Sequence, residues 1–304
     1  MELKHLQAFA VVAEELHFGR AADRLGIAQP QLSQWIKRLE ADLGSPLFSR
    51  STRSVRLTQQ GEAILQPARQ TIDWARRTEL AVLANDPEVF GKVRVGYAGA
   101  SSREVLPAVA RALRADEPGI ELDLRSMVYG GHAPGLVAAG DLDVGFSRLP
   151  LQQSRVHGRV FAYERVLVAL PADHRLAALE QVPLSELAQE PWVSFPATKG
   201  SNVRDMALRL AHEAGFTPRI AQEAPDSYAI LGLVAAGVGV SLTVSSVRHI
   251  ETPGLIYRDL TGEPSFLAAI IIWGDAPDRA TRRVLEIMEQ VLPTPESPAG
   301  RVLD

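Results

Sequence analysis

Residues 17–38 read HFGRAADRLGIAQPQLSQWIKR and decide how the first part of the chain folds. Small and apolar residues recur at helical spacing up to Leu25, and Gly26 then breaks the pattern. A second helix is predicted to begin at Gln29, because Pro30 fits the first turn of a helix. Two short helices joined by a tight turn form a helix-turn-helix.

The second predicted helix has a packing face and a free face. At ~100° per residue, its apolar residues gather on one side and its polar residues gather on another. The packing face holds Leu32, Ile36, Leu39 and Leu43. The free face holds Pro30, Ser33, Gln34 and Lys37. Amides, hydroxyls and cations bond base edges and phosphates in the major groove, so this face indicates DNA reading. The alternative is an ordinary solvated face of a core helix.

Two short runs of alternating residues follow, at 47–50 and 55–57, and they predict a hairpin with residues 51–54 at its tip. Such a hairpin beside a helix-turn-helix is a wing. Arginines lie two or three residues apart along it, which suits contacts with phosphates or a narrow minor groove. These arginines are Arg50, Arg53 and Arg56.

The run from Leu6 to Thr58 resembles the winged helix-turn-helix of the LysR-type transcriptional regulators. The shared motifs are Ala21-Ala22, Gln29-Pro30, Leu32-Ser33, Ile36-x-x-Leu39-Glu40, Leu43-Gly44, Leu47-Phe48 and the arginine-rich wing. The resemblance implies contact with double-stranded operator DNA from Gln29, Pro30, Gln31, Ser33, Gln34, Arg50 and Arg53, with Lys37 on the same face. Gln34 stands where the family often has arginine. Ala28 stands where it often has serine, a better helix cap.

The composition is that of an ordinary globular protein of two or three domains, with 304 residues, 46% hydrophobic and 22% charged. The amino-terminal residues lack a secretory signal, and no run approaches ~18 apolar residues, so we expect a cytoplasmic protein that does not insert in a membrane. There is no cysteine, which excludes disulfides, thiolate metal sites and thiol-based redox sensing. No metal or other cofactor is expected.

The net charge of −4 is unevenly divided along the chain. Residues 1–60 contain eight Lys/Arg and six Asp/Glu, a net charge of +2. The other 24 basic and 30 acidic residues give the remainder of the chain a net charge of −6. The positive excess therefore lies on the segment that is predicted to read DNA.

A long helix is predicted after the wing, with Thr58 as its amino-terminal cap and its end near Leu83. Pro67 should kink it. Apolar residues at three-four spacing indicate pairing with a partner helix. They are Leu65, Ala68, Ile72, Ala75 and Val82. We therefore expect a winged domain at 1–58 and a dimerising linker at 59–87, and the resemblance implies a homo-oligomer, a dimer of dimers.

From about Gly91 strand-like runs alternate with helical ones, which predicts an α/β domain with mostly parallel sheets. The strands are expected at 93–97, 120–124, 142–146, 166–170, 192–195, 220–222, 238–242, 256–260 and 267–273. The helices are expected at about 102–115, 133–139, 184–189, 202–214, 227–236 and 279–291.

This segment also resembles the family, in Leu106-Pro107, in residues 140–146 and in residues 233–240. The resemblance implies a periplasmic-binding-protein-like sensor of two lobes at 88–304. We expect lobe I at about 88–162 and 267–292, lobe II at about 163–266, and chain crossings near 161–165 and 264–268. The tail from Pro293 is rich in Pro, Ser, Gly and Glu and is predicted to be disordered.

Two helix amino termini are predicted to face the cleft between the lobes. Ser101 and Glu104 match a capping box after the first sensor strand, and Ser201 or Asn202 can cap a helix near Val203. Helix amino termini at the carboxyl ends of strands suit a carboxylate ligand.

The resemblance implies effector contacts at Ser101, Ser102, Gly130, His132, Arg148, Ser201, Asn202, Val203 and Tyr228. Arg148 is the expected charged partner, although an ion pair within the protein is an equal alternative. His132 also fits a solvated loop position. The run around Arg148 most resembles regulators that respond to benzoate, muconate or chlorinated relatives, which suggests an aromatic or dicarboxylic acid. Ala100 and Val203 depart from that subgroup, which can offer a hydroxyl and an aromatic ring there.

An enzyme is not expected, because the signatures of acyl transfer, nucleotide binding and zinc peptidases are all absent. The resemblance instead implies that an effector changes the arrangement of subunits on a dyad operator and thereby promotes contact with RNA polymerase. An alternative is a DNA-binding regulator that has no small-molecule effector.

Overall fold

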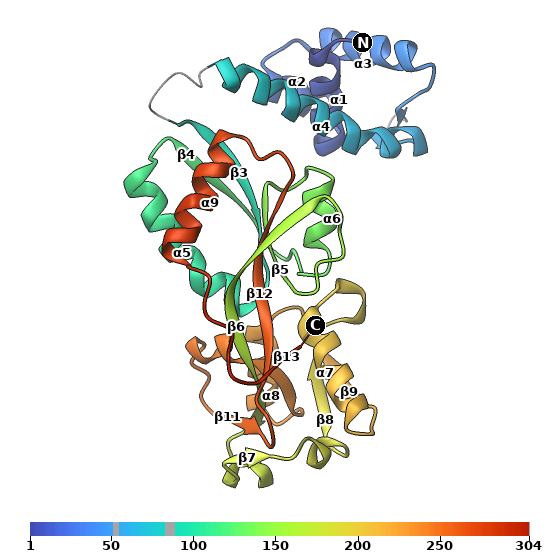
Figure 1. Cartoon of the computed structure of the whole chain (residues 1–304). Helices are drawn as coiled ribbons and strands as arrows, with labels where there is room; N and C mark the ends of the chain where they lie inside the picture. Colours follow the sequence, from blue (N-terminus) through green and yellow to red (C-terminus); the bar gives the residue numbers. More distant parts are fainter. Residues whose placement is uncertain (51–54, 83–88, 304) are drawn as a thin grey trace. The chain divides into compact units, whose positions relative to one another are not determined.

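The computed structural model describes residues 1–50, 55–82 and 89–303. The chain divides into two compact units, Met1–Pro87 and Glu88–Asp304 (Figure 1). The predicted wing tip at 51–54 lies outside the described residues, as does the segment 83–88. Among the described helices, none has the length and apolar character needed to cross a membrane.

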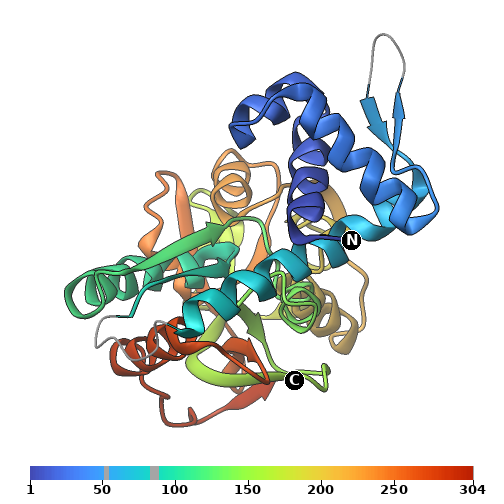
Figure 2. The same cartoon turned by 90° about the horizontal axis from the view of Figure 1, so that it is seen from above.

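The first unit has the predicted helix-turn-helix and hairpin (Figure 2). Its elements are α1 (Leu3–Glu15), α2 (Phe18–Leu25), α3 (Gln29–Leu43), β1 (Phe48–Arg50), β2 (Val55–Leu57) and α4 (Gln59–Val82). Strands β1 and β2 are antiparallel, with Ser49 opposite Arg56. Helix α2 ends at Gly26, whose φ of 65° is left-handed and favours glycine. The expected winged helix-turn-helix is confirmed.

One apolar core holds the three helices and the hairpin together. Leu32, Ile36 and Leu39 of α3 are fully buried, as the angular pattern predicts, whereas Leu43, which the pattern places on the same face, is exposed at the end of the helix. The Phe48 ring lies 5.4 Å from the Phe9 ring and 6.0 Å from the Phe18 ring, measured between centroids. These contacts fix β1 against α1 and α2, and burial of such side chains stabilises by ~1.5–3 kcal/mol each.

Helix α4 begins as predicted, with the Thr58 hydroxyl accepting a hydrogen bond from the Gly61 amide at 3.0 Å. Part of its apolar face packs within its own chain. Ala68 is buried in the core of the first unit, where α4 meets α1, and Leu65 and Ile72 are partly buried against it. Three-four spacing alone cannot tell which helix a face meets, so the pairing of α4 with a partner helix stays a prediction.

The second unit alternates helices with strands, as predicted. Its elements are β3 (Gly91–Gly96), α5 (Gly99–Asp116), β4 (Ile120–Arg125), α6 (Ala133–Ala138), β5 (Val144–Arg148), β6 (Val156–Pro171), η2 (Arg175–Ala178), β7 (Gln181–Val182), η3 (Leu184–Leu187), β8 (Pro191–Ser194), η4 (Ala197–Lys199), α7 (Asn202–Glu213), β9 (Arg219–Glu223), α8 (Ser227–Ala235), β10 (Ser241–Val244), η5 (Ser245–His249), β11 (Leu255–Leu260), β12 (Ser265–Gly274), α9 (Arg279–Val291) and β13 (Arg301–Leu303).

Most described strands of the second unit form a mixed sheet rather than a mostly parallel one, and β8 and β9 pair parallel in a separate two-stranded sheet. The order is β4-β3-β5-β12-β6-β11-β7, with β10 also on β6 and β13 on β12. Strands β4, β3 and β5 are parallel, but β12 pairs antiparallel with both β5 and β6. The chain runs down β6 and returns along β12, so these two long strands must be antiparallel (Figure 1).

Strands β6 and β12 connect two lobes, each with its own apolar core. We use lobe I for the part around β3, β4, β5, α5, α6 and α9, and lobe II for the part around β8 to β11, α7 and α8. The predicted crossings fall on paired residues of the two strands, with Ala162 opposite Ala269 and Arg165 opposite Phe266. A register shift between Ala269 and Ile270 marks the same place, as bulges often do where strands bend.

The tail after α9 is ordered, which contradicts the predicted disorder. Its end forms β13, parallel to β12, and Leu303 is buried in the core of lobe II. Arg301 also donates to both carboxylate oxygens of Glu213, at 2.6 and 2.9 Å. The prediction of disorder rested on the composition of the whole tail. Only its last residues, Arg301–Leu303, make these contacts, and they change the overall composition little.

Candidate functional site

Helix α3 presents a polar, exposed face. Gln29, Pro30, Gln31, Gln34 and Lys37 are exposed, and Ser33 is half-buried. The backbone of Arg50 lies in β1, whereas its side chain, like the whole of Arg53, is outside the described part. The structure therefore brings six of the eight predicted DNA-contacting side chains onto one helix.

The first turn of α3 leaves its amides open. Its cap position is Ala28, whose side chain accepts no hydrogen bond, and Pro30 occupies the first turn. Helix α2 differs, because its cap His17 accepts from the Gly19 and Arg20 amides through Nδ1, at 3.1 and 3.2 Å. An uncapped helix amino terminus attracts phosphate oxygens, which suits α3 for docking on a DNA backbone.

The cations of the first unit divide into paired and unpaired groups. Arg20 and Arg24 contact the carboxylate of Glu15, each at 3.2 Å, and they lower the pKa of that carboxyl by hydrogen bonding. Arg38 contacts Asp42 at 3.3 Å. In contrast, Lys37 forms no ion pair with any described residue. Its charge is thus available to an external anion.

In the second unit a pocket lies between lobes I and II. It is lined by Ala98, Gly99, Ala100, Ser101, Tyr129, Gly130, Phe146, Ser147, Arg148, Phe161, Phe195, Ser201, Asn202, Val203, Ser227, Thr243 and Val244. The cavity volume is about 60 Å³. The lining combines aromatic side chains with serines, Asn202 and Arg148, a mixture that is typical of a site for a small molecule.

The first residues of three helices line this pocket: Ser101 is in the first turn of α5, Asn202 opens α7 and Ser227 opens α8. Helices α7 and α8 are capped by the side chains of Ser201 and Asp226, respectively. Helix α5 begins at Gly99, after Ala98, and no side chain caps it. The positive ends of these helices favour a negative ligand.

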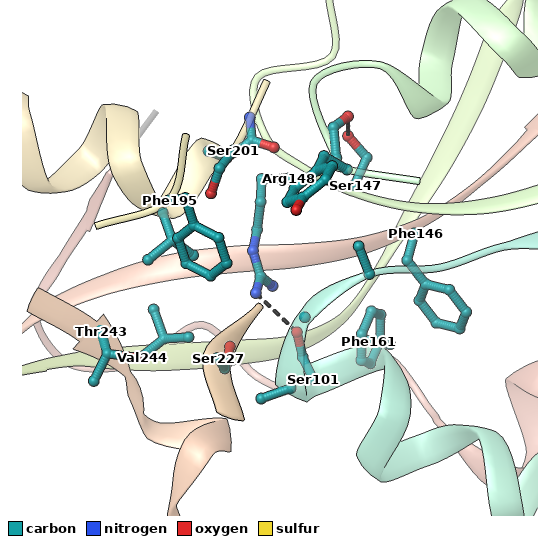
Figure 3. Close-up of a pocket in the computed structure, with 17 residues that line it drawn as sticks. Ser101, Phe146, Ser147, Arg148, Phe161, Phe195, Ser201, Ser227, Thr243 and Val244 are labelled. Atoms are coloured by element: carbon teal, nitrogen blue, oxygen red, sulfur yellow. Dashed lines mark hydrogen bonds between the residues drawn. The ribbon is translucent and has the colours of Figure 1, made fainter. Parts of the chain in front are cut away.

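Arg148 lies at the centre of the pocket, at the end of β5 (Figure 3). Its Nη2 donates to the Ser101 hydroxyl at 2.9 Å and also contacts Oε2 of Glu164. Both Arg148 and Glu164 are almost completely buried. The expected ion pair within the protein is therefore present, although Nε and Nη1 of Arg148 have no partner among the described residues.

Ser101 does not act as the predicted helix cap. Helix α5 begins at Gly99, three residues earlier than the 102 that the capping-box pattern indicates, so Ser101 lies inside the first turn and its hydroxyl is free to meet Arg148. The prediction for lobe II was correct, because Ser201 accepts from the Arg204 amide at 3.4 Å.

Six of the nine predicted effector residues line the pocket: Ser101, Gly130, Arg148, Ser201, Asn202 and Val203. The other three do not line it. The Ser102 hydroxyl donates back to the Ala98 carbonyl at 2.6 Å, as a buried helix serine often does. His132 is exposed against Gly200, and Tyr228 is exposed with its ring 5.6 Å from the Arg103 guanidinium.

The apolar and aromatic lining was not foreseen. Tyr129, Phe146, Phe161, Phe195 and Val244 all come from strands and loops that meet only in the folded chain. Ser227 could have been found, because Asp226-Ser227 before a predicted helix repeats the cap signal of Ser201-Asn202. Glu164, in the strand run FAYERVLVAL, was also missed.

A polar-faced winged helix-turn-helix and a two-lobed α/β unit with a pocket between its lobes define a DNA-binding regulator with a ligand-binding domain. Comparison with known proteins agrees with this class. Residues 3–62 match the family described as "Bacterial regulatory helix-turn-helix protein, lysR family", and residues 87–293 match "LysR substrate binding domain". The chain belongs to the LysR family of transcriptional regulators, and its relatives are regulators rather than enzymes.

Individual relatives match over nearly the whole chain. The regulator ShiR of Corynebacterium glutamicum (strain R) is 39% identical, over 93% of this chain and 96% of that protein. The crystal structure of full-length CbnR complexed with its target DNA has a TM-score of 0.76 and 27% identity, covering 96% of this chain and 100% of that one. Full-length BenM has a TM-score of 0.60 and 28% identity, covering 98% and 100%.

Proposed function

We propose that this protein binds a dyad operator through paired winged helices and responds to a small carboxylate held in the pocket around Arg148. We further propose that it acts as a homo-oligomer, a dimer of dimers, and that effector binding promotes contact with RNA polymerase. The similarity to CbnR, whose structure contains its target DNA, supports the proposal that this protein binds operator DNA. The exposed polar face of α3 supports base and phosphate contacts from Gln29 to Lys37.

The observation that carries the effector proposal is the position of Arg148. A guanidinium with two nitrogens that have no partner among the described residues lies in a pocket that also receives the amino termini of α5, α7 and α8. Each of these features favours an anion, and the planar guanidinium matches a carboxylate in particular. The serine and asparagine side chains at the helix starts supply further hydrogen bonds.

The size of the pocket favours a small aliphatic acid over an aromatic one. Its volume of about 60 Å³ is several times that needed by one water molecule, but it is well below the ~150 Å³ of a cavity that holds benzene. An aromatic acid would therefore have to widen the pocket or extend beyond its open side. The benzoate-like and muconate-like effectors suggested by the resemblance fit less well than acids of two to four carbons.

A ligand in this position can act by holding the lobes together. Lobe I already contacts lobe II where the Gly131 amide donates to the Gly200 carbonyl at 3.0 Å and where the Tyr129 hydroxyl meets the Pro225 carbonyl. An effector that binds residues of both lobes prefers the closed arrangement over any more open one. That preference is the free energy with which it can shift the regulator.

The test is thermal unfolding of the full-length protein against aliphatic and aromatic carboxylates, with the corresponding amides as neutral controls. A ligand at a hundred times its Kd stabilises by ~2.7 kcal/mol, a shift that is easily measured. Arg148→Gln should lose the shift but keep its affinity for operator DNA, measured by fluorescence anisotropy. A carboxylate that stabilises both proteins equally would place the effector outside this pocket.

One observation favours the alternative of a regulator without an effector. Glu164 already neutralises Arg148, so the pocket can be satisfied without any ligand. If no carboxylate or amide stabilises a protein that binds operator normally, a DNA-binding regulator without an effector becomes the better-supported function.

A further inference from the structure

We propose that Glu164 is a specificity-determining residue, which restricts the effector to acids with a single negative charge. This inference rests on the proposed function, because it concerns the ligand of the same pocket. It goes further by assigning a role to a residue that does not line the pocket and by separating monocarboxylates from dicarboxylates.

The geometry places Glu164 directly behind the guanidinium. It lies on β6 opposite Leu267 of β12, where the chain crosses between the lobes, and its side chain is 3% exposed. Its Oε2 contacts Nη2 of Arg148, and its Oε1 accepts no hydrogen bond from any described residue. Arg148 is thus the group that compensates this carboxylate.

The neighbouring cation is committed elsewhere. Arg165 follows Glu164 in the strand, but its Nη2 contacts Asp259 at 3.1 Å and its amide donates to the Ser245 hydroxyl at 3.1 Å. Glu164 and Arg148 therefore form a pair with no net charge at the base of the pocket. A buried carboxylate with one cation partner cannot release that partner cheaply.

A ligand in the pocket can contact Arg148 but not Glu164. Arg148 lines the pocket, and no described residue bonds its Nε or Nη1, whereas Glu164 is covered and is not among the pocket-lining residues. One carboxylate can take the free side of the guanidinium while Glu164 keeps Nη2. The site then holds two carboxylates and one guanidinium, and the helix amino termini supply the remaining positive potential.

A second negative charge on the ligand has no cation to meet. Among the pocket-lining residues Arg148 is the sole Lys or Arg, and its charge is already shared. A dicarboxylate of the same length would bring its second charge into a partly desolvated site beside the buried Glu164 carboxylate, and like charges in such a site repel. Neutralising Glu164 should remove this penalty, and most of the gain should go to dianions.

The experiment measures Kd by isothermal titration calorimetry on the full-length protein at pH 7 in a buffer without carboxylates. The ligand pairs are propionate with malonate and butyrate with succinate, which match in carbon number and differ in charge. The proteins are the wild type, Glu164→Gln and Glu186→Gln. Glu186 is a matched control, because it is also a glutamate paired with an arginine, Arg175 at 2.7 Å, but is exposed and does not line the pocket.

In the wild type and in Glu186→Gln, the monocarboxylate of each pair should bind at least tenfold more tightly. In Glu164→Gln the dicarboxylate should gain at least tenfold more affinity than its monocarboxylate. Equal gains, or wild-type protein that binds malonate or succinate better, would overturn the inference and leave the proposed function standing. If Glu164→Gln does not fold, the wild-type ratios decide alone.

If none of these acids binds any of the proteins, the proposed carboxylate effector fails, and this inference fails with it. That outcome is distinct from binding without discrimination, which contradicts only the role of Glu164.

Discussion

Lys37 is the cation of α3 that remains available to DNA, because it makes no ion pair with a described residue while Arg38 beside it contacts Asp42. We predict that Lys37→Gln weakens operator binding and lowers the slope of log affinity against log salt by about 1, the loss of one phosphate contact. Fluorescence anisotropy over a salt series measures both quantities.

Arg38→Gln is the matched control for this prediction, since it removes an equal charge from the adjacent position of the same helix. Its salt slope should stay near that of the wild type. Equal slopes in the two variants would show that the charge of α3 acts at long range and that Lys37 meets no particular phosphate.

Tyr257 should make the unfolding free energy of the protein depend on pH in the alkaline range. Burial raises the pKa of its hydroxyl to about 12, and the hydroxyl donates to the Val247 carbonyl at 3.4 Å. Because this pKa is higher in the folded state than in the unfolded state, the stabilisation from Tyr257 is fully present below pH ~10 and is lost as pH rises towards 12. We predict that the difference in unfolding free energy between the wild type and Tyr257→Phe shrinks over this range.

Urea unfolding at pH 8, 10 and 11 tests the prediction for Tyr257, with the Phe variant as the reference that cannot ionise. At pH 8 the variant should be less stable by ~0.5–1.5 kcal/mol, the worth of a typical hydrogen bond. A difference that stays constant from pH 8 to pH 11 would show that Tyr257 ionises as easily in the folded protein as in the unfolded chain.

Strand β13 is the element that composition concealed, and Leu303 is its anchor, buried among residues of the lobe II core. We predict that Leu303→Ala lowers the unfolding free energy of the protein by about 2 kcal/mol, because truncation of a buried leucine costs ~2–5 kcal/mol and a chain end can partly adjust. Val302→Ala, at the neighbouring half-buried position, should cost less.

Chemical denaturation of both variants, followed by circular dichroism, provides the comparison. If Leu303→Ala and Val302→Ala are equally close to the wild type, the tail contributes nothing to lobe II, and the disorder predicted from its composition would describe it better than β13 does.

Local patterns predicted most elements, and they failed where distant parts of the chain decide. The helix-turn-helix followed from Gly26 and from the spacing of Leu32 and Ile36, all of which act within a few residues. Helix α5, however, begins at Gly99, and the Ser101 hydroxyl accepts a hydrogen bond from Arg148, 47 residues away, instead of capping the helix. No local signal reports such a contact.

Local patterns also failed to predict part of the pocket, which is built from residues across the whole second unit. The helix start at Asn202 could be predicted from its cap signal, whereas Arg148 followed only from the resemblance to the family. The aromatic lining could not be predicted, since Phe146, Phe161 and Phe195 lie on three different strands or strand ends. Glu164 was missed for a related reason: a single acid in an apolar strand does not reveal which arginine it meets.

The contact between Gly131 and Gly200 joins the two lobes of the second unit, so a change at this contact should alter effector binding. A Cβ atom on Gly131 would lie 2.8 Å from the Gly200 carbonyl oxygen, too close for real atoms, so an added methyl group must separate the loops. We predict that Gly131→Ala weakens effector binding at least tenfold, because the ligand must then close lobes that the methyl group holds apart.

Gly135→Ala is the matched control, because it adds the same methyl group four residues away, where no atom lies within 4 Å. Calorimetric titration of the effector and anisotropy with operator DNA should be run on both variants. Gly131→Ala should keep normal affinity for operator, since the changed contact lies wholly within the second unit. If both variants bind effector like the wild type, closure at Gly131 does not contribute to binding, and the pocket must hold its ligand without help from this contact between the lobes.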